Sequence, residues 1–205
     1  MERGAYRYLL NGEPTRIKES FIREVKPDGT WHIESERHAP GVHLAVSARG
    51  SGRRVRDFAV SWKSPAAGSV AVDYRPGEAG LQVRRWRGQQ VEKVPFDAPA
   101  NVRLSPLMRV FAGPLIADII AAGGTAQVLV PDVRKPEDGQ ALLRPLLSER
   151  RARLLDEADG LREVEYLGDQ YGPGTRFWLA ADDKLVRYSW QQATDQVWEV
   201  ELLRD

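Results

Sequence analysis

The stretch SPLMRVFAGPLIADIIAAGG, Ser105–Gly124, is the longest apolar run in a chain whose other segments have the pattern of short strands. Ser105 is a favourable helix N-cap, Pro106 suits the first helical position, and Gly123–Gly124 provides a stop. A proline inside a helix removes a hydrogen bond and disfavours α geometry in the preceding residue. We therefore expect two short helices with a kink at Gly113–Pro114.

Each of these two short helices has one apolar side. The apolar residues are Leu107, Met108, Val110 and Phe111 in the first helix, and Leu115, Ile116, Ile119 and Ile120 in the second. Arg109 and Asp118 are the charged residues of the stretch, and each lies opposite the apolar side of its helix. We expect Asp118 to be satisfied by water or by an arginine from a strand.

Alternating apolar and polar residues dominate the rest of the chain. The segments 42–46 (VHLAV) and 58–62 (FAVSW) place apolar residues at every second position, as half-buried strands do. Turn-forming pairs such as Asn11-Gly12 recur about every ten residues, which is typical of antiparallel all-β proteins. Residues 146–157 are also expected to form a strand, although their Leu, Glu and Arg content permits a helix. Residues 131–145, rich in charge and proline, are expected to form an exposed loop.

These patterns predict a mainly β fold with a single large antiparallel, strongly curved sheet, a β-roll or open barrel of about 12–13 strands. A kinked helical insert is expected at about 105–123. We expect one domain over residues 1–205, with an antiparallel meander over 1–100, a helical plug over 104–123 and a second run of strands over 125–205. Because a twisted sheet of this size cannot fill its own concave face, the insert is expected to pack inside it.

The composition limits the possible functions. Cysteine is absent, which excludes disulfides, thiolate metal sites and thiol catalysis. The net charge of +1 argues against a general nucleic-acid binder. Arginine outnumbers lysine by 24 to 6, which coding bias explains more simply than phosphate recognition does.

The N-terminal sequence bears on localisation. The first residues, MERGAYRYLL, lack the apolar core of a signal peptide. No segment reaches the roughly 20 apolar residues that a membrane-spanning helix needs. We therefore expect a soluble cytoplasmic protein without integral membrane contact, or a periplasmic one if a leader has been removed from this chain.

Three histidines, His32, His38 and His43, lie close together in the sequence, and imidazole is a common metal ligand. His32 and His43 alternate with apolar neighbours, so they are expected to point outward from two strands of a hairpin. Their spacing also lacks the i, i+4 pairing of a zinc-binding helix. We therefore interpret them as solvated strand histidines, and no metal site is predicted.

No catalytic constellation is recognisable, so the protein is not predicted to be an enzyme or to hold a cofactor. Ser51 lies in Gly50-Ser51-Gly52, which is expected to be a hairpin turn and not the strand-to-helix elbow of a nucleophile. The glycine-rich pieces at 77–80 and 172–174 are not followed by helices, so they lack the helix N-terminus that binds phosphate.

Basic clusters occur at 53–56, 84–87 and 150–153. The middle cluster contains a tryptophan, as platforms for single-stranded nucleic acid do. Arginine stems also cover apolar neighbours on ordinary solvated faces. We adopt the second interpretation, and no nucleic-acid partner is predicted.

Six tryptophans are the most suggestive residues for binding, and five of them lie in apolar alternation that favours an interior position. There they either complete a filled core or form the aromatic walls of a cavity between the sheet and the insert. The residues predicted to line such a cavity are Trp31, Phe58, Trp62, Met108, Phe111, Leu115, Ile119, Trp178 and Trp190.

Segments along the chain carry a family resemblance. The chain opens with YRYLLNGEPTRIKESF, continues with DGTWHIESE and closes with FWLAADDKLVRYSWQQ. This order resembles an uncharacterised bacterial family whose members open with a Tyr-x-Tyr…Asn-Gly hairpin and close with a Trp-Leu-x-x-Asp turn between strands. The matching residues are Tyr6, Tyr8, Asn11, Gly12, Trp178, Leu179, Asp182 and Asp183.

The fold of that family looks similar to spiral β-rolls and to the open barrels of lipoprotein carriers such as LolA. In those proteins a curved antiparallel sheet wraps a helical element, and the carriers bind acyl chains. The resemblance therefore implies an apolar cavity, and it implies no catalytic residue.

Two hypotheses for the function follow. In the first, the roll binds a lipid, a glycolipid or another apolar small molecule between the curved sheet and the helical insert. In the second, the interior is completely filled, and the protein has a structural or interaction role, with a homodimer joined at a strand edge as the expected assembly.

Overall fold

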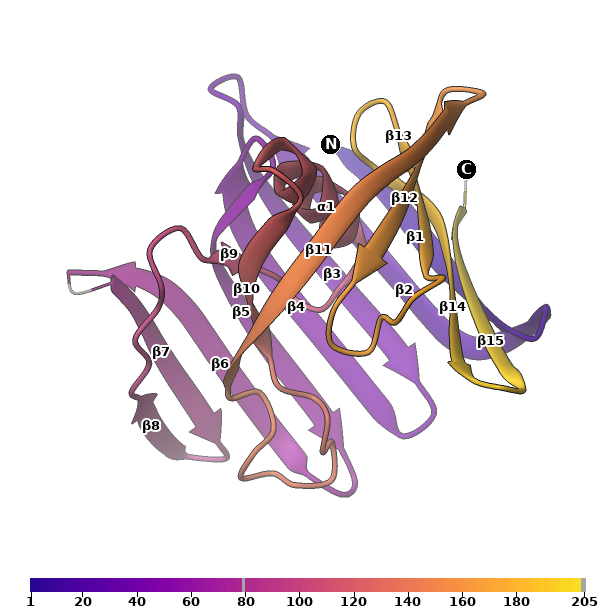
Figure 1. The fold of residues 1–205 in the computed structure, drawn as a ribbon. Helices are drawn as coiled ribbons and strands as arrows, with labels where there is room; N and C mark the ends of the chain where they lie inside the picture. The colour runs from indigo at the N-terminus through magenta and orange to yellow at the C-terminus, as the bar shows by residue number, and fades with distance from the viewer. Residues whose placement is uncertain (79, 204–205) are drawn as a thin grey trace.

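The computed structural model describes residues 1–78 and 80–203, and within them fifteen strands form one sheet (Figure 1). The strands of the first half are β1 (Glu2–Leu10), β2 (Glu13–Val25), β3 (Thr30–Ala39), β4 (Val42–Ser51), β5 (Arg54–Ser64), β6 (Gly68–Gly77), β7 (Gly80–Arg87) and β8 (Gln90–Val94). Those of the second half are β9 (Arg103–Leu104), β10 (Thr125–Pro131), β11 (Pro145–Ala158), β12 (Leu161–Leu167), β13 (Arg176–Ala180), β14 (Leu185–Ala193) and β15 (Gln196–Leu203).

Two antiparallel meanders are joined side by side in this sheet. Strands β1 to β8 form one meander and β10 to β15 the other, and β1 pairs with β15 between them. At that junction Tyr6 is opposite Leu202 and Tyr8 is opposite Val200. The edge strand β9 pairs with β10 in parallel. The predicted mainly β fold with one large, strongly curved sheet is confirmed, with fifteen strands and one parallel pair in the described residues.

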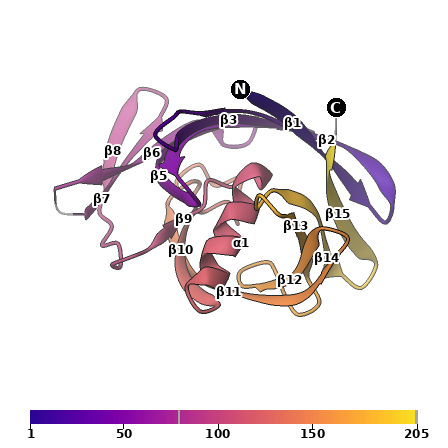
Figure 2. The same ribbon diagram turned by 90° about the horizontal axis from the view of Figure 1, so that it is seen from above.

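The sheet is an open spiral. Seen from above, it curls around the helix α1 (Ala112–Ala121), so that its two halves face each other across the helix (Figure 2). The edge strand β9 lies beside β5, and β6, β7 and β8 continue beyond that contact. The two edge strands, β8 and β9, are not paired with each other. The interior must therefore be closed by parts of the chain other than strands.

The helical insert is present, but its α-helix begins later than the sequence predicts. Arg109–Phe111 forms a 3-10 turn (η1), and α1 follows it directly. Ser105 is not a helix cap, because its N–H donates to the Leu129 carbonyl (2.9 Å) and extends the pairing of β9. Pro114 lies in the first turn of α1 and not at a break between two helices. Backbone N–H groups in a first turn have no intrahelical partner, so the missing N–H of proline costs nothing there.

The insert packs inside the spiral, as the sequence predicts. Ile116 and Ile119 are completely buried. Phe111 is 4% exposed, and its ring lies 6.2 Å from the ring of Trp31 on β3. Burying one such side chain contributes about 1.5–3 kcal/mol, so a helix with several of them provides a large part of the core. At ten residues α1 is too short to span a bilayer, and the described part of the chain holds no longer apolar helix that could do so.

Asp118 ties α1 to two strands that overlap at the seam of the spiral. Its carboxylate accepts hydrogen bonds from Arg103 of β9 (2.9 Å) and Arg54 of β5 (3.2 Å). An arginine from a strand was one of the two partners expected from the sequence, and it is confirmed. Strands β5 and β9 are not paired with each other. The two hydrogen bonds of Asp118 therefore help to hold the edge strand β9 beside β5.

The loop between β10 and β11 is not the exposed segment that its composition predicts. Leu142 and Leu143 are 1% and 0% exposed. Their carbonyls accept hydrogen bonds from Nε of Arg85 on β7 (2.9 Å) and from the hydroxyl of Tyr74 on β6 (2.9 Å). The loop therefore covers β6 and β7, which lie beyond the contact between β5 and β9. Its leucines are buried although charged residues surround them in the sequence.

The strand expected at 146–157 is confirmed as β11. Its burial alternates along its first half, and Arg150 and Ala152 are on the buried side, at 4% and 6% exposure. The interpretation of the basic clusters as solvated faces is therefore wrong for Arg150 and also for Arg85 of the cluster at 84–87, which is 3% exposed. Alternation along a strand sends every second residue to the same face whatever its charge.

Gly113 allows the first turn of α1 to approach the turn between β13 and β14. A Cβ at this position would lie 2.1 Å from the carbonyl oxygen of Asp183 and 2.6 Å from the backbone nitrogen of Leu185. We predict that Gly113→Ala lowers the free energy of unfolding by about 1–3 kcal/mol, because a backbone segment must shift to make room. Unfolding in urea measures the effect.

Gly172→Ala is the matched control for this substitution. A Cβ on Gly172 would meet no described atom within 4 Å, so the change in unfolding free energy should stay within about 0.5 kcal/mol. Equal effects of the two substitutions would show that α1 does not approach the β13–β14 turn closely.

Candidate functional site

A buried carboxylate on β2 links the sheet to the insert. Glu19 is 1% exposed. One of its oxygens accepts hydrogen bonds from the Tyr8 hydroxyl (2.5 Å) and from Nε of Arg37 (2.8 Å), and the other accepts the backbone N–H of Arg109 (2.5 Å). A buried charge is tolerated where it is paired and hydrogen-bonded, and both oxygens of Glu19 meet that condition.

Arg37 extends this link to Leu107, two residues before η1 begins. Its Nη2 donates to the carbonyl of Leu107 (2.8 Å). Leu107 has a φ of 71°, in the left-handed region that a non-glycine residue adopts only where surrounding contacts hold it. The hydrogen bonds of Arg37 and Glu19 therefore determine how the chain enters η1 and where the Arg109 side chain points.

The Arg109 side chain is held by tyrosines and not by an acid. Its Nη1 donates to the Tyr171 hydroxyl (2.8 Å) and its Nε to the Tyr8 hydroxyl (3.3 Å). Its guanidinium carbon lies 4.9 Å from the ring centre of Tyr188, a cation–π contact. Over residues 1–78 and 80–203, no carboxylate forms an ion pair with this guanidinium. Burial works to lower the pKa of Arg109, but the tyrosines and Glu19 raise it above its ordinary value.

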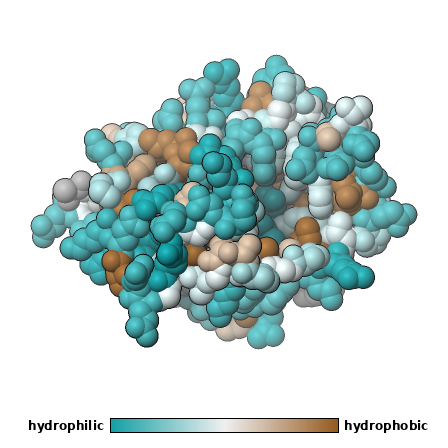
Figure 3. Space-filling view, turned by 90° about the horizontal axis from the view of Figure 1, so that it is seen from below, coloured by the Kyte–Doolittle hydropathy of each residue, from teal (hydrophilic) through white to brown (hydrophobic). Residues whose placement is uncertain are grey.

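Arg109 lines a pocket of about 270 Å³ between the insert and the second half of the sheet. Residues 131–134 and 169–171 also line it, and the β10–β11 loop that contains residues 132–134 reaches the lower end of the roll in Figure 1. Figure 3 views the molecule from that end, which is mainly hydrophilic and is hollowed near its middle. The apolar lining includes Met108, Leu115, Val130, Leu146, Phe177 and Trp190, and the charged lining consists of Arg37, Arg109, Asp132, Arg134, Arg150 and Asp169.

The charged lining has an excess of cations. Arg134 pairs with Asp132 (2.6 Å), and Arg150 pairs with Asp169 (3.0 Å). Arg37 pairs with the buried Glu19 (2.8 Å). Arg109 is therefore the lining arginine that keeps an uncompensated charge within the described part of the chain. An anion that enters the pocket would meet this charge in a medium of lower dielectric constant than water, where attraction is stronger.

An aromatic wall stands beside Arg109. The ring of Tyr171 lies 6.1 Å from Trp190 and 5.5 Å from Phe177, both at steep angles, and Phe177 stacks on Tyr188 at 4.8 Å. Such aromatic pairs contribute more to stability than the burial of their surface area alone. The pocket thus offers one cationic end and one aromatic and aliphatic side.

The nine residues predicted to line a cavity do not lie together. Trp31, Phe111 and Leu115 border a void of only about 30 Å³, which is the volume of one water molecule. The space expected between β3 and the insert is therefore nearly filled. Leu115 also lines the larger pocket, together with Met108 and Trp190.

The other four predicted residues line neither of these voids. Phe58, Trp62 and Ile119 are buried in the core, at 2%, 8% and 0% exposure. Trp178 alternates with completely buried neighbours on β13, and the Arg187 guanidinium lies 4.1 Å from its ring centre. Binding by any of the nine residues stays a prediction.

Three charged residues of the site were missed from the sequence: Arg150 was interpreted as part of a solvated face, and Glu19 and Arg37 were not singled out. The strand pattern contains a usable indication. Glu19 lies between Ile17 and Phe21, on the face that the alternation assigns to the interior. A charged residue at an inward position of a strand is therefore worth testing as part of a buried network.

We predict that Glu19→Gln lowers the free energy of unfolding by about 3–5 kcal/mol, because the partly buried Arg37 loses its charge partner. Denaturant unfolding followed by circular dichroism measures it. Glu165→Gln is the control, since Glu165 pairs with Arg153 (3.0 Å) and Arg176 (3.2 Å) near the surface. Its loss should cost less than about 1 kcal/mol. A cost for Glu19→Gln as small as that of the control would contradict the structural role of Glu19.

The buried tyrosines make the fold sensitive to alkali. Burial raises the pKa of Tyr8 from 10.0 to about 12, and it also raises the pKa values of Tyr6, Tyr166 and Tyr188. A phenol with a raised folded-state pKa stabilises the fold fully below its unfolded pKa, and this contribution is lost as the pH rises towards the folded value. We therefore predict that the unfolding free energy falls between about pH 10 and pH 12.

Phenolate absorbance measures this effect directly. In the native protein most of the absorbance should appear together with the loss of near-ultraviolet circular dichroism, whereas in denaturant it should appear near the ordinary pKa of 10.0. The same titration curve in both states would contradict the burial of these hydroxyls.

Comparison with known proteins bears on the fold. No family model matches the chain, and no curated protein matches it. A solved structure that matches is the crystal structure of a beta-barrel-like protein of domain of unknown function DUF1849 from Brucella abortus. The TM-score is 0.50 and the sequence identity 10%, over 98% of this chain and 95% of that chain. At this identity the likeness shows the fold alone, and it supports the β-barrel-like architecture expected from the sequence.

Proposed function

We propose that the protein binds a small amphipathic anion, with the apolar part in the 270 Å³ pocket and the anionic end on Arg109. The observation that carries this proposal is the Arg109 guanidinium, which lines the pocket and is held by two tyrosine hydroxyls without a carboxylate partner in the described residues. A carboxylate on a medium-length acyl chain has the required chemistry.

The volume limits the size of the ligand. Pockets for small ligands usually measure about 300–1,000 Å³, and this one is just below that range at about 270 Å³. It can enclose a single medium-length chain or a small ring system. A two-chain lipid or a glycolipid is too large to be enclosed, so the proposal narrows the broad class of apolar ligands expected from the sequence.

The lining matches the two ends of such a ligand. Met108, Leu115 and Trp190 can contact an apolar chain, and the Nη groups of Arg109 can donate charge-assisted hydrogen bonds to a carboxylate. The resemblance of the sequence pattern to carriers of acyl chains, LolA-like open barrels, supports the same chemical class.

Decanoate is the probe, titrated into the full chain by isothermal calorimetry. We expect wild-type protein to bind one equivalent. Arg109→Gln should weaken binding roughly 10–100-fold, because hydrogen bonds to a charged group contribute about 1.5–3 kcal/mol. Quenching of tryptophan fluorescence should accompany binding, and Trp190→Phe should remove most of that quenching while the heat of binding remains.

Arg56→Gln is the matched control, since Arg56 is 61% exposed and pairs with Asp57 away from the pocket. It should bind decanoate like wild type. Decanol, which lacks the charge, should bind wild type and Arg109→Gln equally weakly. Absence of decanoate binding by wild type, or undiminished binding by a folded Arg109→Gln variant, would overturn the proposal.

A further inference from the structure

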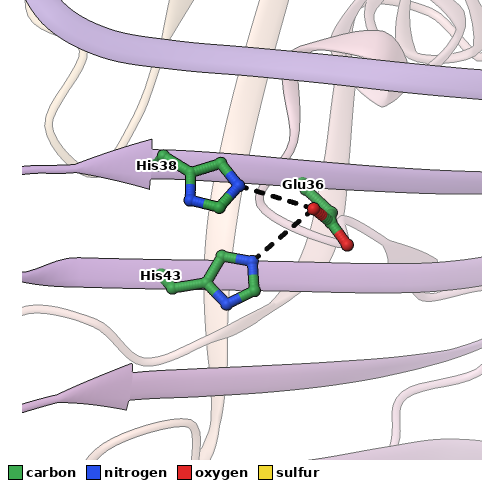
Figure 4. A group of neighbouring side chains, drawn as sticks. All are labelled: Glu36, His38 and His43. Carbon is green, nitrogen blue, oxygen red and sulfur yellow. Dashed lines mark ion pairs between the residues drawn. The ribbon is translucent and has the colours of Figure 1, made fainter.

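Three side chains on the outer surface of the β3–β4 hairpin are placed as metal ligands. His38 and His43 are directly opposite each other in the register of the hairpin, and Glu36 precedes His38 by two residues on the same face. The two imidazole rings are stacked, with centres 4.4 Å apart and planes inclined by 15°. Figure 4 shows that both rings turn a nitrogen towards the Glu36 carboxylate.

The distances suit a tetrahedral ion. His38 Nε2 lies 3.4 Å from Glu36 Oε2, and His43 Nε2 lies 3.7 Å from the same oxygen. The three ligand atoms all lie within 4.8 Å of one another. Zinc bonds to imidazole and carboxylate are about 2.0–2.2 Å long, which places two ligand atoms of a tetrahedron about 3.3–3.6 Å apart. One ion fits among the three atoms after small side-chain rotations.

A second observation concerns His43 alone. Its Nε2 is shielded from solvent and has no hydrogen-bond partner among the residues that the structure describes. The His43 side chain as a whole is 33% exposed, so the shielding is specific to this atom. Buried polar atoms without partners are rare in folded proteins, because their lost hydration is not replaced. A metal ion bound to Glu36 and His38 would occupy the position that this nitrogen faces.

The neighbouring charges set the expected strength of binding. Lys18 of β2 is opposite His38, and Lys63 of β5 is opposite His43, so two cations flank the histidine pair on the same face of the sheet. The positive charges of the two lysines disfavour the binding of a divalent cation, and the negative charge of Glu36 compensates for them only in part. Both lysines are exposed, so solvent and salt reduce their effect. These charges favour moderate binding over the very tight binding of a closed structural site.

We propose that Glu36, His38 and His43 bind one divalent first-row transition metal ion, with water at the fourth position. Imidazole together with carboxylate favours Zn²⁺ or Cu²⁺ over Mg²⁺ and Ca²⁺. None of the three residues lines the 270 Å³ pocket, so the site is independent of the ligand proposed above. The sequence predicts solvated histidines, because they alternate with apolar residues on two strands and lack the i, i+4 spacing of a zinc-binding helix; the structure places His38 directly opposite His43.

Zinc chloride titrated into the metal-free full chain by isothermal calorimetry tests the proposal. We expect one equivalent to bind wild type, and Mg²⁺ to give no heat of binding. His38→Gln and His43→Gln should each weaken Zn²⁺ binding by about tenfold or more, since the loss of a direct ligand costs at least as much as the loss of its supporting contacts. Near-saturating Zn²⁺ should also raise the melting temperature by about 5 °C or more.

His32→Gln is the matched control. His32 is on the same face of β3 and is hydrogen-bonded to Ser47 (2.9 Å), outside the cluster. This variant should bind Zn²⁺ like wild type. Zinc binding that is equal in His43→Gln and wild type, or weakened as much by His32→Gln as by His38→Gln, would overturn the proposal.

Nuclear magnetic resonance of the wild type gives a test that does not depend on any variant folding. The chain has three histidines, so their imidazole signals can be resolved. Zinc should shift the ring signals of His38 and His43 and leave those of His32 unchanged. Absence of Zn²⁺-dependent shifts at His38 and His43 would rule out the site.

Discussion

The Glu19 carboxylate is the contact on which the attachment of the insert depends. It is almost completely buried, and it receives donors from three elements: the Tyr8 hydroxyl of β1, the Arg37 guanidinium of β3 and the backbone N–H of Arg109. A carboxylate in such surroundings must keep its donors, because a buried charge without them is very costly. The interaction therefore specifies one position for the start of the insert, which apolar packing alone would leave less sharply defined.

An open spiral makes this attachment necessary. Strands β8 and β9 end the sheet without pairing to each other, so the interior is closed by side chains and loops. The helix α1 fills the centre, Asp118 joins it to Arg54 and Arg103 at the seam, and Leu142 and Leu143 cover the strands beyond. In a closed barrel the first and last strands are hydrogen-bonded to each other. Here the edge strands stay unpaired, and ion pairs and apolar contacts close the interior instead.

The pocket follows from the same arrangement. The insert enters the spiral through a strained residue, Leu107, before the helix begins, and this leaves space between Met108, Arg109 and the second half of the sheet. Glu19 is occupied by Arg37 and by the backbone of Arg109, so the Arg109 side chain turns to Tyr171 and the pocket. One carboxylate thus holds the insert while the guanidinium of Arg109 stays available to a ligand.

Much of the fold was determined by the sequence itself, because local patterns carry it. Alternation at 42–46 and 58–62, turn pairs such as Asn11-Gly12 and the apolar stretch Ser105–Gly124 predict a curved sheet around a helical insert. Alternation is a local property, so it can be recognised without knowing which strands pair.

The folded structure determines where the charged and histidine side chains meet. Glu19 and Arg109 are 90 residues apart, and their contact depends on how the spiral closes. His38 and His43 are brought together by hairpin register. The burial of Leu142 and Leu143 depends on a seam that no local pattern encodes. The turn between β3 and β4 sets the register that pairs His38 with His43, whereas the closure of the spiral arises from the summed packing of the whole chain, so the pocket is defined only in the folded structure.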